Sequence, residues 1–488
     1  MKLSKEPFHY ERLVEELELK IANGTYKIGE KLPSIRDFHE QQNLSISTVY
    51  KAYVELEMMG LVEARPKSGY YVSGFTKTLK EPTFSLKKSP PRKVDLAAII
   101  HTVHQAISDP RMLPLGGLVI APERLPYKQF ARILKGISAD LMKSLLVYEL
   151  PEGNIELRRQ VAMRTPGIEG GVDPDDIIMT NGCMEALALS LQAVVRPGDT
   201  VIIERPTFFV VLQLLEEMGI YVIEIPTDPT TGMDMAALKK IIETNTVKAC
   251  ITQPNFQNPL GALMPDATKR DMVEFLNSKD IVIIEDNIYS ELYFGESKPV
   301  SLKRFDRKDL VITCSSFSKT LAPGLRIGWV IPGQRFKDRI QRLKTGFSVS
   351  TSSLDQYVLA EFLSGGGYDR HLRVLRSQVR KQVRATAQAV QNFFPEKTRL
   401  MIPQGGAFLW VQLPDGIDSV ALYWKALEHK IAILPGTVCS ASHMFGNHVR
   451  LSCGYPVTNT ILEGIRTLGN LVRGMDKENT LSHRKKSL

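Results

Sequence analysis

The sequence predicts a small, mainly α-helical module at the N-terminus, followed by a much larger α/β domain that ends in a smaller α+β lobe. Residues 1 to about 75 read as short helices followed by a hairpin, whereas from about Val94 to Met475 apolar strand-like runs alternate with helical segments. Between these parts the sequence loses its periodicity and gains prolines and lysines, which is typical of a linker. At 488 residues, the chain is also longer than one hydrophobic core usually serves.

The composition is that of an ordinary globular protein. Its apolar share is 43%, and a formal net charge of +9 is compatible with binding nucleic acid or phosphate without requiring either. The five cysteines are odd in number, widely spaced and lack zinc-site spacing, so we expect reduced thiols and no metal. Acidic residues stand where a signal peptide would be apolar, and no uncharged run approaches membrane length. We therefore expect a cytoplasmic protein.

The first predicted helix runs from about Tyr10 to Asn23. Leu13, Leu17 and Ile21 recur at fourfold spacing with glutamates opposite them, and Gly24 stops the helix. One face of this helix is therefore buried.

Two further helices are predicted, separated by a short break. The second opens at Ser34, whose hydroxyl can cap the free N–H groups while Asp37 complements the same helix end. The third runs from about Ser47 to Met59 and ends at Gly60. Its exposed start carries Ser45, Ser47, Thr48 and Tyr50. Two helices joined in this way match the helix-turn-helix, in which the start of the second helix enters the major groove of DNA.

A hairpin follows the third helix. Leu61–Ala64 and Tyr70–Val72 read as its strands, and Arg65–Gly69 forms a basic tip that could lie along the DNA backbone as a wing. Helix-turn-helix geometry also occurs in proteins that never touch DNA, so a small helical docking domain is the alternative reading.

These segments resemble the winged helix of the GntR family of regulators. The resemblance rests on Leu32-Pro33-Ser34-Ile35-Arg36, on Ser47-Thr48-Val49-Tyr50 and on Ser68-Gly69-Tyr70-Tyr71-Val72. It implies DNA contacts by Arg36, Ser45, Ser47, Thr48 and Lys67. Tyr50 belongs to the same surface, but it stands where many relatives have arginine, so no base preference is carried over.

The large domain contains short apolar runs bounded by turn residues. Val201–Ile203, Val222–Ile225 and Ile281–Ile284 are three of them, and they predict a mainly parallel sheet covered on both faces. Beyond about Gly346 the strands thin out and a long arginine-rich helix appears. Its basic residues between Arg370 and Arg384 favour solvent contacts or ion pairs between lobes over a second DNA contact.

The strongest local signal is the stretch from Ser315 to Gly328, which follows the predicted strand Leu310–Cys314. It combines a lysine, several hydroxyls and an arginine around a Pro-Gly turn. A lysine amine can form a Schiff base with an aldehyde, while an arginine fork and serine hydroxyls can hold a phosphate dianion. Pyridoxal 5′-phosphate (PLP) offers both groups. A lysine in a surface loop is the alternative for the motif by itself.

This stretch resembles the lysine motif of aminotransferases of PLP-dependent transferase fold type I. The resemblance implies that Lys319 carries the Schiff base and that Ser316, Ser318 and Arg326 bind the cofactor, the phosphate above all. Between a strand and an apolar helix, Gly182, Cys183 and Met184 match the family's phosphate cup, Met184 through its backbone.

Further motifs of the same family follow in the expected order. Asp286 ends an apolar strand and matches the carboxylate beside the pyridine nitrogen, and Tyr289 matches the donor to the phenolic oxygen. The resemblance implies a ring-stacking role for Phe208, a bond from Asn258 to the phenolic oxygen, and a grip on a ligand α-carboxylate by Arg450 with Asn258. Tyr148 matches the tyrosine that reaches the partner subunit's phosphate, which implies a homodimer.

The architecture as a whole resembles the MocR subfamily of GntR regulators. The implied parts are a winged helix-turn-helix at 1–74, a linker at 75–93, an aminotransferase-like domain at 94–475 and a polar tail at 476–488, with the large lobe at about 115–345 and the small lobe at about 346–475. The resemblance implies a transcriptional regulator that binds double-stranded DNA and senses an amine or amino acid through an aldimine at Lys319. PLP as the sensed ligand and a working aminotransferase with an accessory DNA-binding domain remain open.

Overall fold

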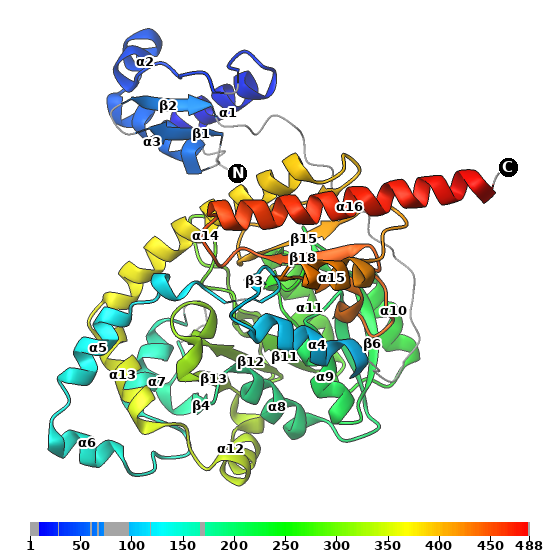
Figure 1. The fold of residues 1–488 in the computed structure, drawn as a ribbon. Helices are drawn as coiled ribbons and strands as arrows, with labels where there is room; N and C mark the ends of the chain where they lie inside the picture. Colours follow the sequence, from blue (N-terminus) through cyan, green and yellow to red (C-terminus); the bar gives the residue numbers. More distant parts are fainter. Residues whose placement is uncertain are drawn as a thin grey trace, which may run out of the picture.

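A computed structural model describes residues 9–27, 29–58, 61–65, 68–72, 97–117, 119–165 and 171–486. A small N-terminal module lies on one side of a much larger domain, over the long helix α14 (Figure 1). The predicted linker, residues 75–93, lies outside the described residues. No helix within the described ranges is both long and apolar enough to cross a bilayer.

The N-terminal module consists of three helices and a hairpin. Its elements are α1 (His9–Ala22), α2 (Ile35–Gln42), α3 (Ile46–Met58), β1 (Val62–Arg65) and β2 (Gly69–Val72). The predicted fourfold row of α1, Leu13, Leu17 and Ile21, is buried against Phe38 and Tyr53 of the other two helices. The predicted helices and hairpin are therefore confirmed, within one or two residues at their ends.

The predicted cap of α2 is present as a capping box. The Ser34 hydroxyl oxygen accepts a bond of 3.2 Å from the Asp37 backbone N–H, and the Asp37 carboxylate accepts one of 3.3 Å from the Ser34 backbone N–H. Asn43 then ends α2 in the left-handed conformation, with φ of 52°. These local signals place the short turn between α2 and α3.

The large lobe is built on an eight-stranded sheet of order β4-β13-β12-β11-β8-β5-β6-β7. Its bounds are β4 (Ile178–Thr180), β13 (Gly328–Ile331), β12 (Val311–Ser316), β11 (Val282–Asp286), β8 (Ala249–Thr252), β5 (Thr200–Arg205), β6 (Tyr221–Asp228) and β7 (Gly232–Met233). The pairs β12-β11, β11-β8, β8-β5 and β5-β6 are parallel, whereas β13 and β7 run antiparallel to their neighbours. The predicted mainly parallel sheet is confirmed.

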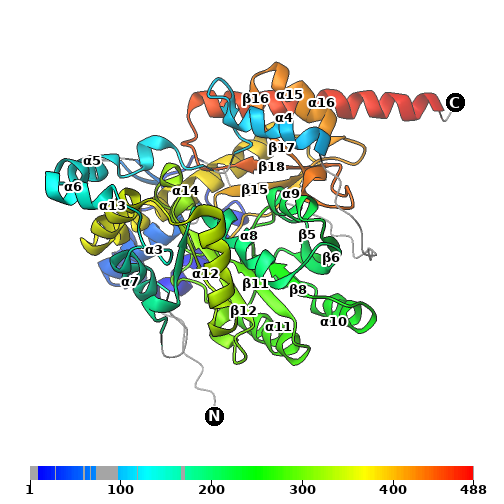
Figure 2. The same cartoon turned by 90° about the horizontal axis from the view of Figure 1, so that it is seen from below.

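Helices cover both faces of this sheet (Figures 1 and 2). Ile203 and Ile284 belong to one apolar cluster with residues of α8 (Cys183–Val194) and α9 (Phe209–Glu217). Ile202 and Ile283, their neighbours in sequence, belong to another cluster with residues of α10 (Met235–Thr244) and α11 (Asp266–Ser278). Successive strand residues point to opposite faces, so both faces are buried and the strands are apolar throughout.

The small lobe contains the four-stranded sheet β14-β15-β18-β17. Its elements are β14 (Arg399–Leu400), β15 (Phe408–Gln412), β17 (Leu434–Pro435), β18 (His448–Ser452), α14 (Gly367–Phe393), α15 (Ser419–Glu428) and α16 (Asn459–Lys486), the last running into the polar tail. The early strand β3 (Leu113–Pro114) pairs with β16 (Ile431–Ala432), so it packs with this lobe although it precedes the large one in sequence.

The arginine-rich face of α14 makes ion pairs with two other parts of the chain. The Arg376 guanidinium lies 2.9 Å from the Glu291 carboxylate of the large lobe, which is an inter-lobe pair of the kind expected. The Arg380 guanidinium lies 3.7 Å from the Glu55 carboxylate of α3. The α14 helix therefore contacts the large lobe and the N-terminal module together.

Candidate functional site

The predicted site residues of the large lobe gather at the carboxyl ends of neighbouring strands. Asp286 is the last residue of β11, and Lys319 ends the short helix η4 (Phe317–Lys319) directly after β12. Gly182, between β4 and α8, stands at the N-cap of that helix. The carboxyl ends of strands in an open α/β sheet are the usual place for a ligand site.

The Lys319 amine lies in an environment that favours its neutral form. Burial and, next, the positive charge of Arg450 lower the pKa of Lys319 to about 8, while Asp286 opposes this effect. A neutral amine is a nucleophile, so Lys319 is suited to attack a carbonyl carbon near physiological pH.

The Asp286 carboxylate is buried and accepts hydrogen bonds on both oxygens. The Gln253 side chain donates to Oδ2 at 2.9 Å, and the Ile288 backbone N–H donates to Oδ1 at 3.1 Å. Burial raises the pKa of Asp286 to about 6, an effect that the bonds from Ile288 and Cys183 and the charge of Lys319 partly offset. Asp286 can therefore carry its charge at neutral pH and face a cationic ring nitrogen.

Gln253 is a site residue that sequence reasoning missed. Its Nε2 donates to Asp286, and its Oε1 accepts a bond of 2.5 Å from the backbone N–H of Asn258. One buried amide therefore fixes two predicted cofactor ligands. Its position could have indicated this role, because Gln253 is a polar residue directly after the buried strand β8.

The side chain and the backbone N–H of Cys183, one of the residues predicted for the phosphate cup, have different surroundings. Its thiol is buried and lies 3.5 Å from Asp286 Oδ1 as a donor, so its side chain faces the carboxylate. Only its backbone N–H is available at the start of α8 for an anion. Burial and the nearby Asp286 charge raise the pKa of Cys183, which keeps the thiol protonated.

The start of α8 and Arg326 form a cradle with the chemistry that a phosphate group needs. Gly182 has φ of 86°, and a Cβ added to it would collide with the Arg326 guanidinium. Arg326 donates to the Ser318 hydroxyl at 3.5 Å and to the Asn181 carbonyl at 3.3 Å. Because these partners and its third, the Pro323 carbonyl, are all uncharged, the described residues leave the positive charge of Arg326 uncompensated. The hydroxyl of Ser316, the last residue of β12, accepts a bond of 3.2 Å from the Ser318 N–H.

Arg450, on β18 of the small lobe, reaches across to the large lobe. Its Nη1 donates to the Asn258 side-chain oxygen at 3.0 Å, and its Nη2 donates to the Gly116 carbonyl at 2.5 Å. The residue is only 1% exposed, and its buried Nε has no hydrogen-bond partner among the residues that the structure describes. A buried guanidinium with a spare donor is suited to bind a carboxylate.

The remaining predicted residues of the large domain differ in exposure. Tyr289 is buried with its ring edge-on to Phe408 at 5.3 Å between centroids, and burial raises its pKa, against the opposing charge of Arg450. Phe208 and Met184 are partly buried at the starts of α9 and α8. Tyr148 instead is 84% exposed, so this single chain does not bring it into the buried cluster.

The predicted DNA-facing residues lie on the surface of the N-terminal module. Arg36, in the first turn of α2, is exposed, as are Ser45, Ser47 and Tyr50 around the start of α3. The Ser45 hydroxyl lies 2.8 Å from the hydroxyls of Ser47 and Thr48 and accepts a bond from the Thr48 N–H, so Ser45 also caps α3. Lys67 lies outside the described residues.

Comparison with known proteins gives two family matches and several relatives. Residues 125–463 match the model of aminotransferase class I and II, and residues 9–72 match that of the bacterial regulatory proteins of the gntR family. The chain is similar to the uncharacterized HTH-type transcriptional regulator YdcR of Escherichia coli (strain K12), with 38% identity over 466 residues, 95% of this chain and 99% of that protein. It is also similar to YjiR of the same organism, another uncharacterized HTH-type transcriptional regulator, with 35% identity over 95% of this chain and 98% of that one.

Among solved structures, the fold is similar to that of LysN, the α-aminoadipate aminotransferase of Thermus thermophilus, complexed with N-(5′-phosphopyridoxyl)-L-leucine. The identity is 29%, the TM-score is 0.72, and the match covers 78% of this chain and 95% of that chain. The Pyrococcus horikoshii kynurenine aminotransferase matches at 28% identity with the same TM-score, over 78% of this chain and 95% of that one. These matches leave about a fifth of this chain uncovered, a length close to that of residues 1–96.

Proposed function

Since this chain belongs to the aminotransferase class I and II family and carries a gntR-family module at its N-terminus, the MocR-like arrangement, we propose that it is a PLP-dependent, DNA-binding transcriptional regulator. This proposal rests on one observation: the chain joins an exposed start of α3 to a half-buried lysine, a buried carboxylate and an anion cradle. Relatives similar along 95% of the chain are named transcriptional regulators, whereas the similar aminotransferases cover 78% of it. Because its target would be bacterial chromosomal DNA, we place it in the cytoplasm.

The cofactor of this regulator is PLP, and the donor set fits that molecule. Lys319 would hold its aldehyde carbon, and the start of α8 with Ser316, Ser318 and Arg326 would hold its phosphate. Bound PLP supplies an electron-withdrawing ring that activates an attached amine. We assign Asp286 to the ring nitrogen and Asn258 with Tyr289 to the phenolic oxygen; Phe208 would stack on the ring.

An amine or amino acid is the ligand class that this site suits best. The guanidinium of Arg450 has a buried Nε that no described residue hydrogen-bonds, and its Nη1 donates a hydrogen bond to Asn258. A ligand carboxylate there would change a contact that joins the two lobes. A ligand shifts a conformational equilibrium only through differential affinity, and a joint between lobes is a place where such a difference arises.

The test of this function combines two measurements on the purified full-length protein. Titration with a panel of amino acids should change both the visible absorbance of the bound cofactor and the affinity for DNA upstream of its own gene. Multiple turnovers with a keto acid acceptor, without any DNA binding, would instead support the second candidate, an aminotransferase. That candidate is kept because Lys319, Asp286, Tyr289 and Arg450 are all present.

Replacing Arg36 with alanine should weaken operator binding by about tenfold, because charged phosphate contacts contribute about 1.5 kcal/mol or more each. The slope of log affinity against log salt concentration should also become shallower by about 1, the change expected when one phosphate contact is lost. Fluorescence anisotropy with labelled operator at several salt concentrations measures both quantities. Glu40→Ala, an exposed change on the same helix, is the matched control. An unchanged affinity and salt slope for Arg36→Ala would count against this docking face.

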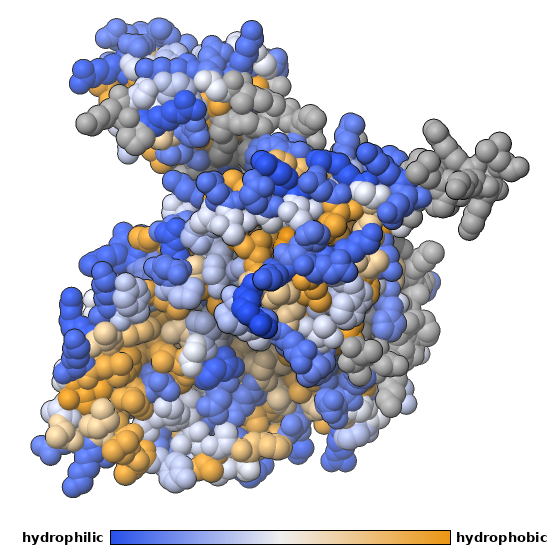
Figure 3. Space-filling view, in the orientation of Figure 1, coloured by the Kyte–Doolittle hydropathy of each residue, from blue (hydrophilic) through white to orange (hydrophobic). Residues whose placement is uncertain are grey.

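We further propose a homodimer formed through the surface around α6 (Ala139–Leu145). Leu146, Val147, Tyr148 and Leu150 are between 63% and 84% exposed, and Figure 3 shows an apolar patch on the same side of the molecule. Patches of this kind usually mark an interface. Leu146→Glu should therefore convert dimer to monomer in light scattering after size exclusion. The control is Trp424→Glu, because Trp424 is also exposed and apolar but lies elsewhere, on α15. This variant should leave the molar mass unchanged.

The uptake of PLP by the cofactor-free protein should accelerate as the pH rises through about 8, because only the neutral amine of Lys319 attacks the aldehyde and its pKa is about 8. Stopped-flow absorbance across buffers of constant ionic strength gives the profile. Arg450→Gln removes a charge that lowers this pKa, so its profile should shift to higher pH. A wild-type midpoint near the ordinary lysine pKa of about 10.4 would contradict the assignment.

A further inference from the structure

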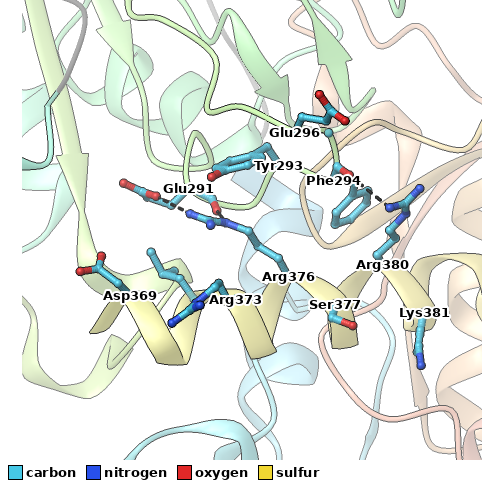
Figure 4. A pocket seen from close by; sticks show the side chains of 12 residues that line it. Glu291, Tyr293, Phe294, Glu296, Asp369, Arg373, Arg376, Ser377, Arg380 and Lys381 are labelled. Carbon is cyan, nitrogen blue, oxygen red and sulfur yellow. Dashed lines mark hydrogen bonds and ion pairs between the residues drawn. The ribbon is translucent and has the colours of Figure 1, made fainter. Parts of the chain in front are cut away.

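A cavity lies outside the predicted cofactor site, between α14 and residues 291–296. Its volume is about 610 Å³, within the range of about 300–1,000 Å³ that small-molecule sites occupy. One wall is the basic face of α14, and the opposite wall carries Tyr293 and Phe294 (Figure 4). Four basic side chains, Arg373, Arg376, Arg380 and Lys381, line it.

The acidic side chains of the cavity leave part of this positive charge unmatched. Glu291 pairs with Arg376 at 2.9 Å, and also with Lys298 at 2.6 Å outside the cavity wall. Asp369 lies 3.5 Å from Arg164, which is not among the lining residues. Of the remaining charged residues that line the cavity, one is acidic, Glu296, and three are basic, namely Arg373, Arg380 and Lys381.

Two of these three basic residues also hold the DNA-binding module. Arg380 lies 3.7 Å from Glu55 and Lys381 lies 4.0 Å from Glu57, both on α3. These distances exceed those of direct hydrogen bonds, so the pairs are weak. Arg373 forms no hydrogen bond or ion pair with the described residues, and its side chain is exposed.

The docked arrangement also carries an unfavourable contact one turn further along α14. The Nη1 of Arg384 is buried and has no hydrogen-bond partner within the described part of the chain. Burial, and next the charge of Arg380, lower the pKa of Arg384 to about 9, although Glu55 and Glu18 of the module act against this. A guanidinium desolvated in this way opposes docking, so a modest competing interaction is enough to displace the module.

We propose that this cavity binds a small polyanion, a phosphate ester or a polycarboxylate, and that the bound anion draws Arg380 and Lys381 away from Glu55 and Glu57. The cavity would then be an effector site separate from the cofactor site. Its occupation would release the module from α14 while leaving the start of α3 unchanged. Docking and anion binding weaken each other by the same factor, because linkage between two binding events is reciprocal.

The cavity arm of the test is calorimetric titration of the PLP-saturated full chain with inorganic pyrophosphate, without DNA and at constant ionic strength. Arg373→Gln should weaken pyrophosphate binding by about tenfold, the size expected for a charged hydrogen bond. Arg370→Gln is the matched control, since Arg370 is exposed on the same helix and does not line the cavity. Equal weakening by both variants, or no binding, would overturn the proposal. Circular dichroism melting shows that both variants are folded.

The second part of the test measures the competition, and it changes Glu55, the acidic partner of Arg380 on α3. Glu55→Gln removes a competitor for Arg380 and should tighten pyrophosphate binding about threefold, the scale of a weak ion pair. An unchanged affinity in this variant would overturn the competition. Citrate in place of pyrophosphate separates the two anion classes, because the site is a polycarboxylate site if citrate binds more tightly and a phosphate site if pyrophosphate does. Since no DNA or amino acid is present, failure here leaves the proposed function standing.

Discussion

A Lys319→Ala variant should lose PLP on dialysis, whereas the parent protein should keep it. The cradle formed by the start of α8, Ser318 and Arg326 is intact in this variant, so the cofactor should still bind, but on the order of a hundredfold more weakly, about 3 kcal/mol. The change in operator affinity with amino acids should disappear as well. Absorbance after dialysis and anisotropy with labelled operator measure the two effects.

Two matched variants separate the covalent role of Lys319 from its charge. Lys319→Arg keeps a positive charge between Asp286 and Arg450 but cannot attach an aldehyde, so it should behave like the alanine variant. Lys397→Ala changes an exposed lysine of the same lobe as Arg450 and should behave like the parent. A Lys319→Ala protein that responds to amino acids as the parent does would remove this lysine from ligand sensing, even if operator binding itself were normal.

Local sequence signals were sufficient where one short segment determines one feature. Ser34 and Asp37 are three residues apart and cap the same helix, so their capping box could be read directly. Apolar runs bounded by turns predicted the sheet, because strands buried on both faces need no alternation. Asp286 ends β11 and Lys319 follows the neighbouring strand β12, so their placement at one edge of the sheet follows from the strand order.

Features that depend on contacts between distant segments could not be read in this way. The bonds of Gln253 to Asp286 and Asn258 need the register between two strands and a turn. The pairing of β3 with β16 joins segments more than 300 residues apart, Leu113 with Ile431. The Arg380–Glu55 contact joins the small lobe to the N-terminal module, and it is a weak ion pair. Sequence gives the charges, but only the packing of the parts decides which ones meet.

Gly328 of β13 lies in close contact with the start of α8. Its replacement by alanine should therefore have a large effect on stability and on cofactor binding. A Cβ at this position would lie 2.5 Å from the backbone carbonyl carbon of Gly182 and 2.8 Å from the backbone nitrogen of Cys183. Both obstacles are backbone atoms, so no side-chain rotation relieves the clash. The start of α8 must move, and with it the N–H groups assigned to the cofactor phosphate.

The Gly328→Ala variant should therefore be less stable by about 1–3 kcal/mol, the usual cost of overpacking, and should also bind PLP more weakly. Pyridoxal, which lacks the phosphate, distinguishes the two effects, because its binding should fall much less than that of PLP. Gly324→Ala is the matched control, since a Cβ there meets no atom within 4 Å. Thermal unfolding of the cofactor-free proteins gives the stability change. If Gly328→Ala lowered the affinities for PLP and pyridoxal equally, the clash would act on the site as a whole, and the assignment of this cradle to phosphate would fail.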